Sequence, residues 1–258
     1  GLVGMATDTQ ITVSYSTASV TGTMSNAGGL VGYLNNGSIR NCYATGPVTS
    51  TGTDNYSGGL VGLLYSADCE IDYCYAAGKV TGEGETGGLV GHSNTNDIRY
   101  SYFNIGNAGS SDDDYGSKGI GVKVIDLLYE SEYDNWDFYR FGSEIWMIDP
   151  GESYPYLLEN EQIPHPAPPA ATSARFVGDS GDYNAATKTL TMTYGCDIAC
   201  FKVEDVTPAD GLAKLSSSNT AVTDVWWGSD GDIIIETEGA GTATVSLQNS
   251  DGSTLDSV

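Results

Sequence analysis

A four-residue marker, Gly-Leu-Val-Gly, recurs at nearly constant spacing in the N-terminal part of the chain. It begins at Gly1, Gly29, Gly59 and Gly88, so successive units are 28, 30 and 29 residues long. An isoleucine follows each marker, and a tyrosine lies four residues after each isoleucine. The third unit carries two extra residues near positions 65–68. Self-similarity at such a period indicates a stacked repeat architecture.

Each unit is too short to bury an apolar face by itself, so neighbouring units have to stack. The apolar residues lack the 3.6-residue period of helices, whereas residues 39–44 and 46–50 have the pattern of short strands between turns. We therefore predict an all-β protein with a β-solenoid (β-helix) over residues 1–103, one unit of about 29 residues per coil. The predicted interior columns are Leu2, Leu30, Leu60, Leu89 and Ile11, Ile39, Ile71, Ile98, while the facing of the valine column stays open.

Stacking also places the tyrosines of successive units in one column. An aromatic ladder that stabilises the sheet is one interpretation, and we favour it. A sugar-binding stripe is the other, because the flat face of an aromatic ring suits a sugar ring. The four residues are Tyr15, Tyr43, Tyr75 and Tyr102.

Two more columns follow from the same alignment. Cys42 and Cys74 would lie in adjacent coils, as a disulfide or, as we favour, as two buried thiols. One position after each isoleucine, Arg40, Asp72 and Arg99 alternate in charge, which predicts support of the register and no catalytic role.

The order of residues within the second unit carries a resemblance. Gly-Gly-Leu-Val-Gly at 28–32, followed by Ile-Arg-Asn-Cys-Tyr-Ala-Thr-Gly-Pro-Val at 39–48, closely resembles the GLUG repeat of bacterial surface proteins. The resemblance covers roughly residues 1–103. In that family the repeat occurs in adhesins and in large immunoglobulin-A-cleaving proteases, outside their catalytic domain. It therefore implies a secreted or cell-surface bacterial protein and brings no catalytic residue with it.

Residues 104–163 are rich in aromatic side chains, and we predict that they form the C-terminal cap of the solenoid. They resemble the segment that closes many GLUG arrays. A carbohydrate cleft that uses Trp136 and Trp146 is the alternative. Residues 122–133 are the best helix candidate in the chain. The acids Asp112, Asp113 and Asp114 are a weak Ca²⁺ candidate, and we favour a solvated turn there because the spacing of a known calcium loop is missing.

Residues 164–173 are predicted to be a Pro-rich, semi-rigid linker. Residues 174–258 alternate between strand patterns and turn signals, which predicts a β-sandwich. Residues 217–225 and 241–245 resemble a bacterial immunoglobulin-like domain of group two, which implies a spacer or adhesion module. The pair Trp226–Trp227 departs from that pattern, as do Cys196 and Cys200. A disulfide between these cysteines requires the backbone to turn there, because a straight strand would hold them too far apart.

Acidic residues outnumber basic ones by 34 to 10, giving a formal net charge of −24. Nucleic acids and anionic membranes are bound through Lys and Arg clusters, which this sequence lacks. No apolar run approaches the ~18 residues of a membrane helix. We therefore predict no nucleic-acid partner and no membrane insertion within this fragment. The chain begins inside a repeat and without Met, so we expect it to be a processed or trimmed fragment.

Catalysis has little support in the sequence. A hydrolase needs two facing carboxylates and a lyase needs a cationic groove, and the repeats offer neither. His92 occupies a position held by Met5, Tyr33 and Leu63 in the other units, and His165 lies in the predicted linker. We predict an adhesin-like structural or binding protein without catalytic activity or cofactor, whose partner is a host or neighbouring-cell surface protein or glycan. The alternatives are a glycan-binding accessory module of a larger surface enzyme and, least favoured, a β-helix polysaccharide-degrading enzyme.

Overall fold

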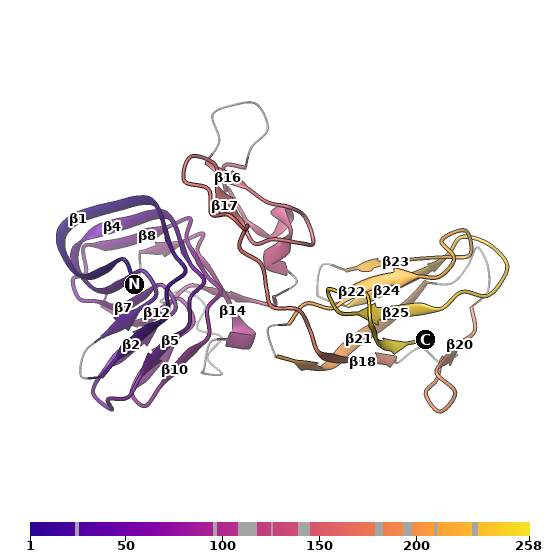
Figure 1. The fold of residues 1–258 in the computed structure, drawn as a ribbon. Helices are drawn as coiled ribbons and strands as arrows, with labels where there is room; N and C mark the ends of the chain where they lie inside the picture. The colour runs from indigo at the N-terminus through magenta and orange to yellow at the C-terminus, as the bar shows by residue number, and fades with distance from the viewer. Residues whose placement is uncertain are drawn as a thin grey trace. The chain divides into compact units, whose positions relative to one another are not determined.

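The computed structural model describes residues 1–23, 26–94, 97–107, 118–124, 126–138, 145–178, 183–192, 198–208, 211–228 and 232–258. The chain divides into two compact units, Gly1–Ala167 and Pro168–Val258 (Figure 1). Within the described residues the regular structure is almost entirely β, and its helical part consists of the short 3-10 turns η1 (Ile105–Asn107), η2 (Asp126–Leu128) and η3 (Glu130–Glu132). The boundary between the units lies inside the Pro-rich segment 164–173.

The first unit is built on a parallel sheet that follows the repeat. Strand β1 (Val3–Ser16) pairs with β4 (Val31–Ala44) along its whole length. The same path is divided in the later coils into β7 (Val61–Leu64), β8 (Cys69–Asp72), β9 (Tyr75–Ala76), β12 (Val90–Ser93), β13 (Ile98–Arg99) and β14 (Tyr102–Asn104), and β15 (Ile120–Val122) then adds to β14. Equivalent isoleucines are register partners, Ile11 with Ile39, Ile39 with Ile71, and Ile71 with Ile98.

Two smaller parallel sheets complete the coils. One contains β2 (Val20–Gly22), β5 (Val48–Ser50) and β10 (Val80–Gly82), and the other contains β3 (Ala27–Gly28), β6 (Tyr56–Gly58) and β11 (Glu85–Gly87). The strands stack coil upon coil in Figure 1. The predicted β-solenoid is thus confirmed, with about three turns.

The interior of the solenoid follows the predicted columns in the inner coils. Leu30, Leu60 and Leu89 are fully buried, and the valine that follows each of them is buried too, so both residues of the pair face inward. Leu2 is an exception, being 54% exposed. Among the isoleucines, Ile98 in the last coil is only partly buried.

The first glycine of the marker is required by the close approach of adjacent coils. A Cβ atom on Gly29 would lie 2.1 Å from the carbonyl oxygen of Gly59, and one on Gly59 would lie 2.1 Å from that of Gly88. Real Cβ atoms do not come so near to oxygen, so a side chain there would push the coils apart.

Each coil also turns a corner two residues after its isoleucine. The residue there has a left-handed backbone conformation, with φ between 47° and 52°. Non-glycine residues are uncommon in that region, so its recurrence in every coil marks a fixed feature of the repeat. The four corner residues are Val13, Asn41, Tyr73 and Tyr100.

The chain after β15 differs from the expected helix. The described part of residues 122–133 forms the separate 3-10 turns η2 and η3, so the helix prediction was wrong. Tyr129 lies between the turns with φ −131° and ψ 134°, an extended conformation that ends helical hydrogen bonding. Strands β16 (Trp146–Met147) and β17 (Tyr156–Leu157) then pair as an antiparallel ribbon. We call the described residues of 126–167 the aromatic segment.

The second unit contains two antiparallel sheets around one core. The first sheet runs β18 (Ser173–Gly178), β21 (Ile198–Thr207), β24 (Ile233–Thr237), β23 (Thr223–Trp227), and the second runs β22 (Lys214–Ser217), β25 (Val245–Gln248), β26 (Thr254–Ser257). A short hairpin joins β19 (Tyr183–Asn184) to β20 (Thr189–Leu190). Phe201 and Ile233 from the first sheet share the buried cluster with Leu247 from the second.

The segment 164–173 is bonded at both of its ends. In its first half, the carbonyl of Pro166 accepts a hydrogen bond from the Tyr154 amide at 2.7 Å, within the first unit. In its second half, the Ala171 amide donates to the Leu212 carbonyl and the Thr172 amide to the Thr207 carbonyl, within the second unit. Each half of the predicted linker is therefore held by its own unit.

Candidate functional site

The tyrosine column forms a continuous stack through three coils. The rings of Tyr15 and Tyr43 lie 5.1 Å apart with their planes 7° from parallel, and those of Tyr43 and Tyr75 lie 5.0 Å apart at 8°. Tyr102 pairs with Tyr75 through the backbone, but its ring packs edge-on against Tyr133 at 5.1 Å. The sequence therefore predicted the stack correctly for three of its four members.

The aromatic segment covers this stack. The Trp146 ring lies 6.1 Å from Tyr43 and 6.2 Å from Tyr75, and the Trp136 ring lies 4.5 Å from Trp146. Tyr43, Tyr75 and Trp146 are fully buried as a result. Offset and tilted aromatic pairs contribute about 0.5–1.5 kcal/mol each beyond the area they bury, so the cover adds substantially to the stability of the first unit.

Hydrogen bonds fix the buried phenols. The Tyr75 hydroxyl donates to the carbonyl of Pro155 at 2.7 Å, and the Tyr43 hydroxyl donates to Oε1 of Gln162 at 3.1 Å. Burial raises the pKa of both phenols, and the neighbouring stacked tyrosines raise it further. Both groups therefore act as neutral hydrogen-bond donors that attach the aromatic segment to the coils.

The same segment bonds to the corner residues of the coils. The Trp146 indole donates to Oδ1 of Asn41 at 3.3 Å, the Trp136 indole donates to the Tyr100 carbonyl at 2.8 Å, and Asn160 donates to the Val13 carbonyl. These partners belong to the first, second and fourth coils. The aromatic segment thus lies along the side of the coils, where we had expected a cover over the last one.

The burial of these rings bears directly on sugar binding. A stripe that stacks on sugars needs exposed ring faces, whereas Tyr43 and Tyr75 are completely buried and Tyr102 is 3% exposed. Trp136 and Trp146, the alternative cleft residues, are 8% and 0% exposed. Only Tyr15, in the first coil, is partly exposed. The two alternatives, a sugar-binding stripe and a carbohydrate cleft, therefore lack exposed ring faces in this structure, apart from Tyr15.

In the column of alternating charges, Arg40, Asp72 and Arg99, one of the two arginines forms an ion pair with the aspartate. Arg99 reaches the buried carboxylate of Asp72 through two hydrogen bonds of 2.9 and 3.2 Å, in a bidentate arrangement. Arg40 is the register partner of Asp72 on the other side, but its guanidinium lies over the Tyr73 ring, 5.0 Å from the centroid. The column supports the register through one ion pair and one cation–π contact.

The cysteines of the solenoid are buried free thiols. Cys42 donates to the Arg40 carbonyl at 3.2 Å, and Cys74 donates to the Asp72 carbonyl at 3.1 Å. Burial raises the pKa of Cys74 well above its ordinary value, so the unreactive thiol form is favoured. Cys200 is an exposed free thiol, and Cys196 lies outside the described residues.

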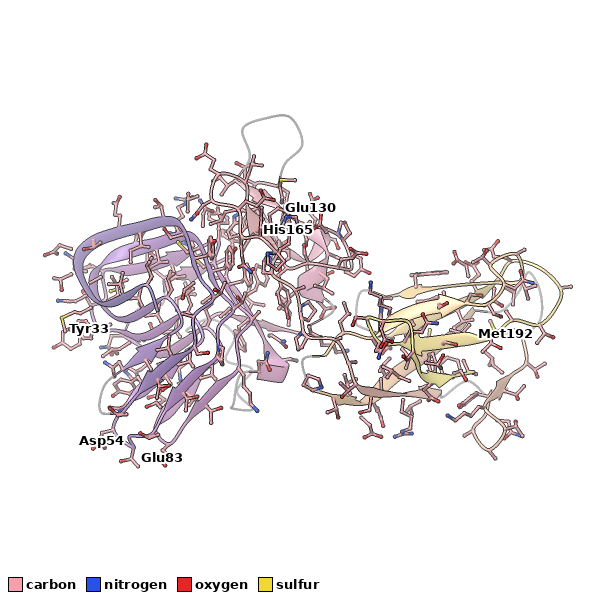
Figure 2. All side chains as sticks on the ribbon, viewed as in Figure 1. Tyr33, Asp54, Glu83, Glu130, His165 and Met192 are labelled. Atoms are coloured by element: carbon pink, nitrogen blue, oxygen red, sulfur yellow. The ribbon has the colours of Figure 1, made fainter. Side chains whose placement is uncertain are left out.

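Both histidines contact carboxylates. His165 bonds Asp149 through Nδ1 at 2.6 Å and Glu161 through Nε2 at 2.8 Å, and it stacks on the Tyr156 ring at 3.8 Å. Figure 2 shows His165 on the aromatic segment. His92 bonds Glu85 through Nδ1 at 2.9 Å. The sequence did not predict the His165 cluster, because a spacing of four residues such as that of Glu161 and His165 predicts contact on a helix, and this segment is not helical.

The possible metal site lies outside what the structure describes. Asp112, Asp113 and Asp114, the weak Ca²⁺ candidate, are not among the described residues. In the described parts of the chain, no three His, Cys, Asp or Glu side chains come together in a way that could hold an ion.

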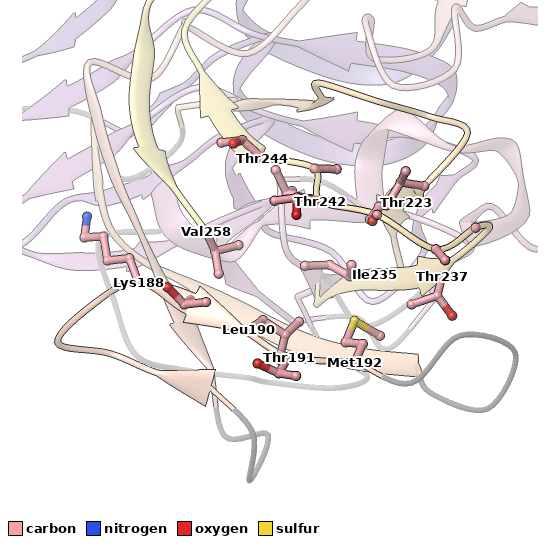
Figure 3. Close-up of a pocket in the computed structure, with 17 residues that line it drawn as sticks. Lys188, Leu190, Thr191, Met192, Thr223, Ile235, Thr237, Thr242, Thr244 and Val258 are labelled. Carbon is pink, nitrogen blue, oxygen red and sulfur yellow. The ribbon is translucent and has the colours of Figure 1, made fainter.

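The second unit has a groove of about 600 Å³ between β20 and the residues that precede β25. Leu190, Met192 and Ile235 line it together with several threonines, and Figure 3 shows Lys188 at one end and Thr237 at the other. Among the described residues that line the groove, Lys188 carries a charged side chain, and its amine pairs with Asp256. The described lining is suited to apolar contact.

Comparisons with known proteins match the repeat region. Residues 25–51 and 53–81 match the GLUG motif. A protein of Evansella cellulosilytica named as a Gly-rich membrane protein is 31% identical over 125 residues, which is 46% of this chain and 14% of that protein. No solved structure matches the chain. In the described residues, no helix has the length and apolarity needed to cross a bilayer.

Proposed function

We propose that this GLUG-repeat chain is a non-catalytic structural and adhesive part of a bacterial surface protein. The observation that carries the proposal is the burial of the repeat residues within the solenoid. Leu60, Tyr75 and their equivalents in the neighbouring coils pack against one another instead of facing a substrate. A repeat used in this way provides a rigid body with an outer face for contact.

The comparisons support a surface location. The GLUG motif is present, and the relative of which this chain covers 14% carries the name of a Gly-rich membrane protein. We propose a cell-surface or secreted protein whose partner is a protein or glycan on a host or neighbouring cell. The excess of acidic residues supports a solubilising, exposed surface.

We further propose that the second unit is a bacterial immunoglobulin-like spacer, and that the aromatic segment serves as a cap attached to the side of the solenoid. Two antiparallel sheets around a shared core support the spacer. Two long-range hydrogen bonds support the cap, because they tie this segment to residues more than a hundred positions earlier. The Trp146 indole donates to Asn41, and Gln162 accepts from the Tyr43 hydroxyl.

The bonding of the histidines supports the absence of catalysis. A histidine that activates a nucleophile needs a serine or cysteine side chain within hydrogen-bond reach of its imidazole ring. His165 has carboxylates on both ring nitrogens, and His92 has Glu85 on Nδ1. An accessory glycan-binding module remains the second candidate, and it would have to use a surface other than the tyrosine stack.

Adhesion of cells that display the full chain tests the proposal. We expect a non-adherent bacterium to gain attachment to epithelial cell layers or to other bacteria when it displays this chain. The matched control is Leu60→Asp, which places a charge in the solenoid core and leaves the second unit unchanged. Equal attachment by both strains would contradict an adhesive solenoid. Release of reducing sugar from a panel of polysaccharides, lost in His92→Gln or His165→Gln, would contradict the non-catalytic assignment.

A further inference from the structure

The outer face of the main sheet carries a row of apolar and aromatic side chains that the buried stack does not include. Met5 is the register partner of Tyr33, Tyr33 that of Leu63, and Leu63 that of His92. Met5 is 71% exposed. Figure 2 shows Tyr33 at the outer edge of the solenoid, on a side that the aromatic segment does not cover.

Tyr65 adds a second ring to this face. It lies in the stretch 65–68 where the third unit carries two extra residues, and 56% of its surface is exposed. Its ring centroid lies 5.6 Å from that of Tyr33, with the planes tilted by 32°. Large apolar side chains that are exposed together on a soluble protein indicate a contact site.

The backbone holds both rings in place. Tyr33 lies within β4, which pairs with β1 on one side and with β7 on the other. The Tyr65 amide donates to the Leu34 carbonyl at 2.9 Å, and its own carbonyl accepts from the Asn94 side chain at 2.9 Å. Rings held in advance lose little conformational entropy when a ligand binds.

A pair of polar residues lies next to this row in the sequence. Asp8 comes three residues after Met5, and Asn36 comes three residues after Tyr33. Asp8 and Asn36 occupy equivalent positions in adjacent coils, both in the left-handed conformation with φ of 51° and 54°. The Asn36 amide donates to the Asp8 carboxylate. Both residues are exposed, so their remaining lone pairs and N–H group can bond to hydroxyl groups of a ligand.

We propose that Met5, Tyr33, Tyr65, Asp8 and Asn36 form a contact site for an uncharged glycan. One face of a pyranose ring presents C–H groups that pack on an aromatic ring, while its hydroxyls bond to carboxylate and amide groups. The charged member of the site is an acid, and the chain carries a net charge of −24, so an anionic glycan would be repelled.

The size of the site also favours a glycan over a protein. A stable protein interface buries about 800 Å² on each partner, and five side chains present much less. The proposal deepens the adhesive role proposed above and rests on it, because it takes the outer face of the solenoid to be presented to another cell. It names the class of ligand and the residues that contact it.

Binding of fluorescent neutral hexasaccharides to the full chain tests the site. The probes are β-1,4-glucan, α-1,4-glucan and α-1,6-mannan hexamers, with a galacturonate hexamer as the anionic counterpart. We expect at least one neutral hexamer to bind and to lose at least tenfold in affinity with Tyr65→Ala, and similarly with Tyr33→Ala. Asp8→Asn should weaken binding less, because the amide still bonds to hydroxyls.

The controls distinguish loss of this site from two other causes of weaker binding, namely the removal of any exposed aromatic ring and the loss of folding. Trp226→Ala removes a 39% exposed ring from the second unit and should leave binding unchanged. Tyr65→Phe keeps the ring face and should retain binding. Circular dichroism and thermal unfolding of each variant report whether it is folded, and the exposure of Tyr65 makes its replacement tolerable.

Several outcomes would overturn the proposal. They are the failure of every neutral hexamer to bind, equal binding by Tyr65→Ala, and preference for the galacturonate hexamer. This face would be a protein-binding site instead if it crosslinked to a protein of the bound cell, if that crosslink depended on Tyr65, and if no glycan bound. Displayed cells that keep their attachment with Tyr65→Ala but lose it with Leu60→Asp would show that the adhesive function stands and that the glycan site is wrong.

Discussion

Tyr43 and Tyr75 stack with their ring centroids 5.0 Å apart, and both are fully buried. Each hydroxyl donates a hydrogen bond to the aromatic segment, Tyr75 to the Pro155 carbonyl and Tyr43 to Gln162. The stack thus joins two kinds of contact, one between successive coils and one between the coils and a segment far along the chain. Removing either kind has a distinct, measurable consequence.

Tyr75→Phe should destabilise the first unit while it keeps the ring stack. It removes the donor to the Pro155 carbonyl in a buried site, and such a loss costs about 1–3 kcal/mol in free energy of unfolding. Urea unfolding followed by tryptophan emission measures it, in a background with Trp226 and Trp227 replaced by Phe so that emission comes from the first unit. Tyr15→Phe, at the partly exposed end of the stack, should cost less because water reaches that position and no buried carbonyl loses its donor.

Gly59→Ala should destabilise the solenoid more than a typical surface substitution. The new methyl group would lie 2.1 Å from the Gly88 carbonyl oxygen and 2.7 Å from the Ala76 Cβ. Forcing extra atoms into a packed region costs about 1–3 kcal/mol. Gly4→Ala is the matched control, since no heavy atom lies within 4 Å of the Cβ it would add. A thermal midpoint for Gly59→Ala as high as that for Gly4→Ala would contradict the close approach of the coils.

Arg99→Met should cost more stability than Arg175→Met, although the two arginines are exposed to the same degree. Arg99 bonds bidentately to Asp72, whose side chain is 10% exposed, whereas Arg175 pairs with Glu204 and Asp205, which are 51% and 71% exposed. Removing Arg99 leaves a nearly buried carboxylate without its partner, at a cost of about 1–2 kcal/mol after allowance for solvent around the arginine. Chemical denaturation of each single variant compares them.

His165 should titrate above its ordinary value. A carboxylate can only accept, so bonds from both ring nitrogens to Asp149 and Glu161 require the imidazolium form. The hydrogen bond to Asp149, and then that to Glu161, raises the pKa of His165 from about 6.5. Since the folded-state pKa lies above the unfolded one, the stabilisation is complete below about pH 6.5 and is lost as pH rises through the higher, folded-state value.

A proton NMR titration of the imidazole ring measures this pKa directly. A His92→Gln background leaves His165 as the single histidine, because the chain contains two. Asp149→Asn should shift the midpoint back towards 6.5. A midpoint at or below 6.5 in the parent protein would mean that the two carboxylates do not hold the imidazolium.

The solenoid thiols should resist modification until the protein unfolds. Cys42, Cys69 and Cys74 are buried free thiols, whereas Cys200 is exposed. With Cys196 replaced by Ser, a water-soluble maleimide should modify one thiol quickly and three more only in denaturant, as counted by mass spectrometry. Failure of Cys42 and Cys74 to react in denaturant without a reductant would reveal a disulfide between adjacent coils.

The register of the coils could be predicted because the repeat constrains it directly. Ile11, Ile39 and Ile71 had to align, since a slip of one residue would turn an interior side chain to the solvent. The burial of each member was harder to anticipate. Leu2 repeats the pattern of Leu30 and yet is 54% exposed, whereas Ile11 in the same coil is 8% exposed.

The candidate site was less predictable, because a column can lie inside or outside according to what covers it. The tyrosine column was compatible with a structural ladder and with a sugar-binding stripe. Arg40 and Arg99 were equivalent in sequence, but only Arg99 pairs with Asp72, while Arg40 lies over Tyr73. The contact between the partly exposed Tyr33 and the exposed Tyr65 was missed, since Tyr65 lies in the stretch 65–68 that the repeat alignment sets aside.

The sequence by itself determined the coil length, the parallel stacking and the identity of the stacked residues, because these follow from a local pattern repeated about every 29 residues. Only the tertiary structure decided which columns are covered. The two residues that accept the hydrogen bonds of the stacked phenols lie far along the chain, Pro155 at 80 positions after Tyr75 and Gln162 at 119 positions after Tyr43. No periodicity in the repeat encodes contacts at that separation, so the buried stack and the exposed face were distinguished by packing alone.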